Sequence, residues 1–325
     1  MTAHAPRRAL VLGAGGVLGA AWTIGALSAV SDSLGWDPRS AEVVIGTSAG
    51  AVVAAMLAGG LGVETLVNHQ RGIPAPGDPQ VDFDPDTASG GARPPMPRLR
   101  IGSTALVAQT VRHPRRMPML AALAGLAPTG RGSLDAVADL VRSVDRGSGW
   151  PSAPRTWIVA MDYADGRRVA FGRTDAPPAD IADAVVASCA IPGWYAPTLI
   201  GDRRYVDGGT LSPTSIDLLC EANVDVDEAI VLAPMASFDY DEPTGVVGRV
   251  ERRFRRAMTR RVVEEAGRLR ARGVQVTVIG PGREDLEAIG ANLMNHRRRH
   301  IVLDVARRTT ADVLAAHHGR LTAAG

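Results

Sequence analysis

Residues 42–50 read EVVIGTSAG, and this stretch decides the fold. Residues 42–45 form a short, mostly apolar run, which predicts a buried strand. The Gly-x-Ser-x-Gly pattern from Gly46 to Gly50 is typical of a sharp turn from a strand into a helix. The glycines are required because a Cβ beside the strained turn would collide with neighbouring backbone. The pattern predicts that Ser48 is a nucleophile at a helix N-terminus, where the helix dipole favours developing negative charge.

A strand, a glycine-rich loop and a helix precede this turn. Residues 9–12 form an apolar strand, residues 13–19 are rich in glycine, and apolar residues recur at helical spacing over 17–33. A helix of small residues over 49–58 follows Ser48. The order strand, helix, strand, helix is typical of a parallel sheet covered by helices. We therefore predict a three-layer α/β/α fold with a mostly parallel central sheet.

The same reasoning places further elements along the chain. The expected strands are 156–161, 167–171, 205–207, 229–232 and 274–279, and the expected helices are 134–144, 181–188, 213–222, 246–272 and 295–316.

The middle of the chain departs from this pattern. Residues 72–100 are rich in Pro, Gly and Asp, which predicts a flexible surface insertion. Residues 106–127 are apolar with basic interruptions, and we expect a helical hairpin that forms a lid. We predict one α/β domain over residues 1–325, with a variable lid-like insertion at about 61–150 and a helical C-terminal extension at about 283–325.

Composition excludes several classes of protein. The net charge is +2, which gives no overall field for binding nucleic acid. All 36 basic residues are Arg, so a lysine Schiff base or a Lys general base is excluded. Cys189 and Cys220 form no metal-binding spacing, and we expect no metal, no cofactor and a reduced, cytoplasmic protein. No uncharged apolar run of 18 or more residues predicts a membrane span.

The glycine-rich loop at 13–19 has two interpretations. Its backbone N–H groups can converge on an anion, as a phosphate cradle for a dinucleotide or as an oxyanion hole for acyl transfer. The glycine spacing is imperfect for a dinucleotide, and Glu42 begins the second strand where an acidic residue should end it. The oxyanion hole is favoured because the predicted nucleophile follows one strand later.

A serine nucleophile needs a base, and the sequence offers two kinds. None of the seven histidines follows a predicted strand, and His296 and His300 are expected on an exposed helical face. Asp207 ends a predicted strand and is followed by Gly208 and Gly209, which allow close backbone approach. Asp207 is therefore the favoured base. An esterase with a histidine triad and a non-catalytic nucleotide- or acyl-binding protein remain as alternatives.

Four blocks together resemble the patatin-like phospholipase family. They are residues 15–19 (GGVLG), 46–50 (GTSAG), 187–193 (ASCAIPG) and 207–209 (DGG), in the family's order. The family uses a Ser-Asp dyad without histidine. The resemblance therefore implies a patatin-like fold and a phospholipase A-like lipase or esterase that cleaves carboxylic esters of lipids. The residues that it implies are Ser48 as nucleophile, Asp207 as general base, Gly15, Gly16 and Val17 as oxyanion donors, and Gly46, Gly50, Gly208 and Gly209 as motif support.

The loop departs from the family pattern at two positions. The family usually reads Gly-Gly-Gly-x-Arg/Lys-Gly, whereas Ala14 takes the place of the first glycine and Leu18 the place of the cation. The backbone donors survive both changes. We expect the missing cation to alter how the loop is anchored or which head group is preferred.

A lipid substrate requires contact with an interface. Residues 106–126 are apolar and contain Arg112, Arg115 and Arg116, and residues 249–272 are predicted to form a strongly basic helix. Either segment suits binding to anionic head groups. We expect a lipid or ester substrate, peripheral membrane contact through one of these segments, and no nucleic acid partner.

Overall fold

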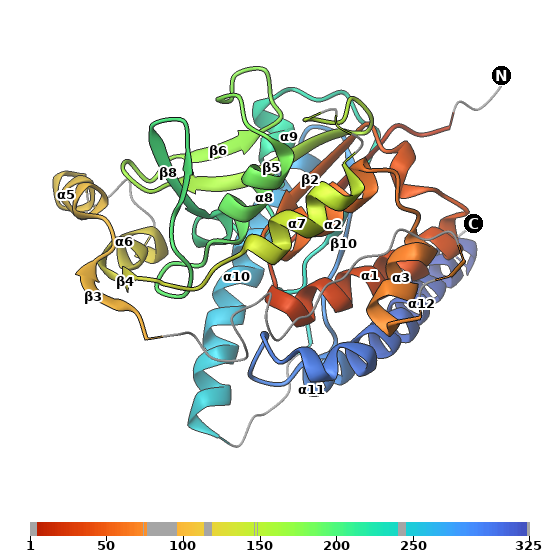
Figure 1. Cartoon of the computed structure of the whole chain (residues 1–325). Coiled ribbons are helices and arrows are strands. Elements are labelled where there is room, and N and C mark those ends of the chain that lie inside the picture. Colours follow the sequence, from red (N-terminus) through yellow and green to blue (C-terminus); the bar gives the residue numbers. More distant parts are fainter. Residues whose placement is uncertain are drawn as a thin grey trace.

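The computed structural model describes residues 5–73, 75–76, 96–113, 119–145, 147, 149–239 and 245–323. Its centre is an eight-stranded sheet with the order β10-β9-β1-β2-β5-β8-β7, in which β6 also pairs with β5 (Figure 1). The parallel strands are β1 (Arg8–Leu12), β2 (Val43–Thr47), β5 (Arg155–Asp162), β9 (Glu228–Leu232) and β10 (Gln275–Ile279). The antiparallel strands are β6 (Arg168–Phe171), β7 (Thr198–Ile200) and β8 (Arg203–Asp207). The predicted mostly parallel α/β/α fold is confirmed.

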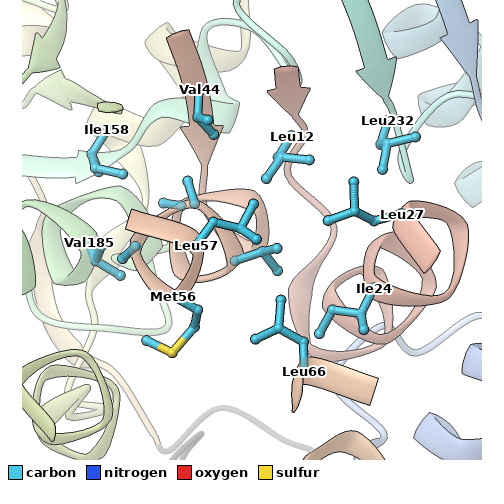
Figure 2. Packing of buried hydrophobic residues seen from close by; sticks show 14 of the residues in the cluster. Leu12, Ile24, Leu27, Val44, Met56, Leu57, Leu66, Ile158, Val185 and Leu232 are labelled. Carbon is cyan, nitrogen blue, oxygen red and sulfur yellow. The ribbon is translucent and has the colours of Figure 1, made fainter. Parts of the chain in front are cut away.

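Alternate residues of each strand face opposite sides of the sheet, because side chains alternate along a strand. Leu10 and Leu12 join a large apolar cluster on one face, whereas Ala9 and Val11 join a second cluster on the other. Figure 2 shows the first cluster, with strand residues such as Leu12 packed against helices. The first face is covered by α1 (Gly16–Leu34), α2 (Ala49–Ala58) and α8 (Ile181–Cys189), and the second by α9 (Leu218–Glu221) and α10 (Val246–Arg270).

Helix α1 is long and apolar enough to cross a membrane, by length and composition only. In the fold, 67% of its most apolar window is buried. Helix α12 (Arg299–Ala323) lies along it (Figure 1), so closely that a Cβ on Gly25 would overlap the carbonyl oxygen of Leu303. This packing is that of a core helix.

The middle segment contains two short helices, α5 (Thr104–Arg112) and α6 (Met119–Leu126), which pack against each other. They are flanked by β3 (Arg98–Ile101) and β4 (Pro128–Thr129), which pair with each other, and they are followed by α7 (Asp135–Val144). Most of the predicted flexible insertion, and Arg115 and Arg116 of the predicted lid, lie outside the described residues. The role of this segment as a lid stays a prediction.

Two predicted helices have different bounds in the structure. The helix expected at 213–222 is reduced to α9, because Ser215 has a positive φ of 56° and the N–H of Ile216 donates to the Glu265 carboxylate instead of a helical carbonyl. The final helix begins at Arg299 after a 3-10 turn over His296–Arg298. The sequence interpretation missed α3 (Val63–Arg71), β3, β4, β7 and α11 (Arg283–Ile289).

Candidate active site

Ser48 occupies the turn between β2 and α2. Its φ is 54°, an uncommon value for a residue with a side chain, and its carbonyl accepts the N–H of Ala51 at 2.8 Å to start the helix. A Cβ on Gly50 would overlap the carbonyl oxygen of Leu12, so only glycine lets α2 pack this closely on the end of β1. Ser48 is buried, with 5% of its surface exposed. The local chain thus holds the serine at the carboxyl edge of the sheet.

The sheet register brings Asp207 to the same place. Thr47 pairs with Val159 of β5, and the next residue of β5, Ala160, pairs with Asp207 of β8. Val159 and Ala160 are adjacent on β5. The end of β2 that leads into Ser48 therefore lies on one side of β5, and Asp207 lies on the other side at nearly the same height. The Ser48 hydroxyl donates a hydrogen bond to the Asp207 carboxylate.

Burial makes Asp207 a stronger base than an ordinary aspartate. It is 5% exposed, and removal from water raises its pKa from 3.8 to about 6. Hydrogen bonds from the Ser48 hydroxyl and from the N–H of Gly209, at 2.7 Å, act in the opposite direction because they favour the charged form. The carboxylate remains mostly ionised at neutral pH and is better matched to taking a proton from serine.

Ser188 fixes the backbone of Ser48. The N–H of Ser48 donates to Ser188 Oγ at 2.8 Å, and Ser188 Oγ donates to the carbonyl of Val159 at 2.6 Å. The buried hydroxyl thereby ties the turn to β5. Sequence reasoning placed Ser188 in a family block but assigned it no role, and that block was the available signal.

The glycine loop presents three unpaired N–H groups. The N–H of Ala14 donates to Pro213 at 2.8 Å, and that of Leu18 donates to Leu293 at 2.9 Å. The N–H groups of Gly15, Gly16 and Val17, which lie between these two, have no acceptor among the described residues. These are the three residues that the resemblance implies as oxyanion donors.

The two departures of this loop from the family pattern have structural counterparts. Leu18 is completely buried and belongs to the apolar cluster, so the chain at this position is anchored by packing rather than by a cation. Ala14 lies against the Asp-Gly-Gly turn, since a Cβ on Gly209 would come within 3.1 Å of the Cβ of Ala14. Gly16 has a φ of 62°, which favours glycine there.

Two cavities meet at Ser48. The inner cavity, about 190 Å³, lies among α1, α2, α3 and α7, and the outer cavity, about 570 Å³, opens between α6, α10 and residues 291–294. Both are lined by Gly16, Ser48, Ile191 and Met294. Asp207 lines the outer cavity. The serine therefore stands where an ester could place its acyl part in one cavity and its alcohol part in the other.

Other candidate groups are arranged differently. Among the described residues no histidine hydrogen-bonds to Ser48 or Asp207, and no cluster of His, Cys, Asp or Glu suits a metal ion. The thiol of Cys189 lines the inner cavity and interacts with Ser48, and burial raises the pKa of this thiol well above its usual range. Cys189 is thus an uncharged neighbour of the nucleophile at neutral pH.

A serine on a strand-to-helix turn at the carboxyl edge of an α/β/α sheet defines the class of the serine hydrolases. Residues 10–219 match the family model of the patatin-like phospholipases, so the chain belongs to this family. It is therefore an enzyme of the phospholipase and carboxylic ester hydrolase class.

The chain is also similar to solved structures. It is similar to VipD from Legionella pneumophila, with a TM-score of 0.43 and 13% identity, over 96% of this chain and 67% of that chain. It is similar to the type III effector protein ExoU, with a TM-score of 0.38 and 18% identity, over 96% of this chain and 53% of that chain. This chain thus spans about two thirds of VipD and about half of ExoU. No curated protein sequence matches it.

Proposed function

We propose that this protein cleaves carboxylic esters of lipids with a catalytic dyad of Ser48 and Asp207. The observation that carries the proposal is that the sheet register brings the buried Ser48 and the buried Asp207 carboxylate to the same edge of the sheet, where the serine hydroxyl hydrogen-bonds to the carboxylate. Three unpaired N–H groups, from Gly15, Gly16 and Val17, stand at the same edge of the sheet among the described residues. Together these groups supply a nucleophile, a base and oxyanion donors.

The reaction proceeds in two steps. Asp207 takes the proton of Ser48 while the serine oxygen bonds to the ester carbonyl carbon, and the loop N–H groups stabilise the oxyanion. The tetrahedral intermediate collapses, the alcohol leaves with the proton from Asp207, and an acyl-serine remains. A water molecule then gives a proton to Asp207 and attacks the acyl carbon. Collapse releases the carboxylic acid and returns the proton to Ser48.

The arrangement of the chain supports a single catalytic domain. Strands from Arg8 to Ile279 share one sheet, and α12 packs on α1. We therefore propose one domain over residues 1–325, with the segment at about 61–150 as a lid-like insertion and residues from about 283 as an extension.

Both cysteines are free, which suits a reducing, cytoplasmic compartment.

We further propose peripheral membrane contact through α10. Its arginines at 249, 253, 256 and 260 recur at spacings of four and three, so they share one exposed face. Phe254, which is 39% exposed, also lines the outer cavity, so contact at α10 brings the cavity to the interface. Arginine side chains near a surface attract anionic head groups.

Active-site labelling tests the catalytic proposal. The protein is treated with a fluorophosphonate probe, the modified peptide is mapped, and hydrolysis of p-nitrophenyl octanoate is measured. We expect the label on Ser48, and loss of both label and hydrolysis in Ser48→Ala. The exposed Ser143 provides the control, and Ser143→Ala should keep both. Absence of label on Ser48 in folded protein, or full hydrolysis by Ser48→Ala, overturns the proposal.

Vesicle flotation tests the membrane proposal. We expect more protein to float with vesicles that contain phosphatidylglycerol than with pure phosphatidylcholine, and Arg253→Ser/Arg260→Ser to remove this difference. The control Arg283→Ser/Arg297→Ser removes the same charge from exposed positions outside α10, and it should keep the difference in flotation between the two kinds of vesicle. Equal flotation of the unmodified protein with both vesicles, or of the two double variants, contradicts contact through α10.

A further inference from the structure

The inner cavity is a slot between the first turns of α1 and α2. Its walls are residues at helical spacing along both helices, from Gly16 to Ile24 on α1 and from Ser48 to Met56 on α2. Each run covers eight residue steps, or about 12 Å at 1.5 Å per residue. Ile24, Met56 and Leu66 give the cavity apolar walls (Figure 2). The cavity therefore extends from the nucleophile about two helical turns into the protein.

Besides Ser48, Cys189 and Tyr195, three polar side chains interrupt the apolar lining. They are His69 and Gln70 of α3 and Arg299 at the start of α12. Arg299 Nε donates to the carbonyl of Gln70 at 3.1 Å. Within the described residues, the other two guanidinium nitrogens of Arg299 have no acceptor, and His69 Nε2 is buried without a partner. No carboxylate is among the described residues that line this cavity.

His69 Nε2 is a buried atom that needs a partner, and the half-buried Arg299 offers hydrogen-bond donors to the same cavity. A buried polar atom without a hydrogen bond costs stability, and one that lines a binding cavity is commonly satisfied by a ligand. The guanidinium of Arg has only donors, in a planar fork that matches the oxygens of carboxylates and phosphates. Among the described residues that line the outer cavity, by contrast, none is Arg or His. Of the described lining residues, the cationic ones therefore belong to the inner cavity.

The packing of α12 on α1 shows how far Arg299 lies from the oxyanion loop. Leu18 donates its N–H to Leu293, and Gly25 contacts Leu303 further along both segments. Arg299 lies between these two contacts in the chain. Its place is thus beside the second turn of α1, roughly 5–10 Å from Gly16 by the rise of the helix. An anionic group held there is several bonds away from an ester carbonyl at Ser48.

We propose that the inner cavity binds a part of the ester substrate that carries an anionic oxygen group, a carboxylate or a phosphate, and that Arg299 and His69 bind that group. The inference rests on the proposed function, because it takes Ser48 as the point of cleavage. It makes Arg299 a residue that determines specificity. The preferred substrates are amphiphilic esters with a negative charge one to two helical turns from the scissile bond.

Matched pairs of substrates test this inference. The first pair is p-nitrophenyl octanoate and the p-nitrophenyl monoester of octanedioic acid, which differ in a terminal carboxylate. The second pair is 1-octanoylglycerol and its 3-phosphate. We expect the unmodified protein to have a higher kcat/KM for the anionic member of at least one pair, and that pair identifies the carboxylate or the phosphate as the recognised group.

Variants of the cavity residues show whether Arg299 causes the preference. Arg299→Gln should lower the ratio of kcat/KM, anionic over neutral, about tenfold, as expected for the loss of a hydrogen bond between charged groups. Arg299→Lys should retain part of the ratio, and His69→Leu should lower it about threefold. Arg297 is exposed in the same segment, and the control Arg297→Gln should keep the ratio.

Two results overturn the inference: no preference for either anionic substrate by the unmodified protein, or an unchanged ratio in both Arg299→Gln and His69→Leu. The two cavity variants come from different helices, so His69→Leu decides the question if Arg299→Gln does not fold. Failure of the proposed function gives a different result, since neither member of any pair is then hydrolysed and Ser48 takes no fluorophosphonate label.

Discussion

The two faces of the central sheet are held together in different ways. The face covered by α1, α2 and α8 is packed with apolar side chains and with glycines at close backbone contacts, such as Gly50 on β1. The face covered by α9 and α10 has a smaller apolar cluster and buried ions beside it. Arg168 bridges Asp217 and Glu221, and the fully buried Glu265 accepts from Arg261, Thr214 and Ile216.

This contrast explains how the candidate site is assembled. The turn at Ser48 and the glycine loop at 13–19 belong to the apolar face and are positioned by close packing. The segment after Asp207 crosses toward the other face, where Glu265 holds Thr214 and Ile216. Pro213 in that segment accepts the N–H of Ala14 in the oxyanion loop at 2.8 Å. Through one short segment of chain, the charged face therefore supports the glycine loop that we propose as the oxyanion hole.

The largest expected effect concerns the residue where the two faces meet, Asp207. We expect Asp207→Asn to lower kcat for p-nitrophenyl octanoate by about a thousandfold, because general base catalysis contributes roughly 10²–10⁴-fold. The control is Asp202→Asn, at an exposed turn of the β7–β8 hairpin, which should keep full activity. Full activity of Asp207→Asn would show that another group is the base.

The same variant has an expected effect on stability. The folded pKa of Asp207, about 6, lies above its ordinary value of 3.8, so this carboxyl contributes stability below pH 3.8 that is lost as the pH rises through 6. At pH 8 the neutral Asn should therefore raise the free energy of unfolding, by at most about 3 kcal/mol. Urea unfolding at pH 8 measures this free energy. A lower free energy of unfolding for Asp207→Asn than for the unmodified protein would contradict the argument that burial disfavours the charged carboxylate.

The next effect tests close packing on the apolar face. Gly50→Ala should lower the free energy of unfolding by about 3 kcal/mol or more, because the new Cβ would overlap the carbonyl of Leu12 in a rigid strand. Urea unfolding with a constant m-value gives the difference. A loss below about 1 kcal/mol would mean that α2 can move away from β1 and that the close contact is not essential.

A comparable test on the charged face is Glu265→Ala. It leaves the buried N–H of Ile216 and the hydroxyl of Thr214 without their acceptor, which should cost about 2–3 kcal/mol of unfolding free energy. We also expect kcat to fall about tenfold. The carbonyl of Pro213, in the same segment as Thr214 and Ile216, accepts the N–H of Ala14, so loss of Glu265 should disturb the position of the glycine loop. Glu264 is an exposed neighbour, so Glu264→Ala is the control. A stability loss with unchanged kcat would separate the charged face from catalysis.

The pH dependence of activity follows from the site itself. Asp207 must be ionised to accept a proton, so kcat/KM should rise about tenfold per pH unit below 6 and level off above 7. Hydrolysis is measured from pH 4.5 to 8, with circular dichroism at each pH to show that the protein stays folded. A level profile, or a midpoint near 4, would contradict the raised pKa of the buried carboxyl.

The smallest effect repeats the glycine-to-alanine change on the other face. Gly267 lies in α10 and is exposed, and among the described residues no atom outside the neighbouring backbone of its own helix lies within 4 Å of the position of a Cβ. Gly267→Ala should therefore raise the free energy of unfolding by about 1 kcal/mol, through helix propensity alone. Alanine is thus expected to lower the free energy of unfolding at Gly50, where the backbone is closely packed, and to raise it at Gly267, where a Cβ has space. A loss of stability at Gly267 would indicate an interaction of this helix that the described contacts do not contain.

The features that depend on local geometry could be predicted from the amino-acid sequence. Alternation and apolar runs predicted the strands of the parallel sheet, and the strand-to-helix turn at Ser48 followed from its flanking glycines. These features are local, because the spacing of buried side chains along a helix or strand and the φ angle of a turn residue depend on a few neighbouring residues. The strand end before two glycines favoured Asp207 as the base, and the position of the glycine loop favoured an oxyanion hole. The resemblance to the family then implied the roles of Ser48, Asp207 and the individual loop donors.

Features that depend on contacts between distant residues required the folded structure. Ser188, 140 residues from Ser48, became a partner of the nucleophile through the sheet register. The helix expected at 213–222 shortened because Glu265, about 50 residues later, supplied the acceptor for Ile216. Arg299 and His69 meet in a cavity although no short pattern joins them. Hydrogen-bond satisfaction and cavity shape are properties of the packed chain, and a single sequence read by local pattern does not contain them.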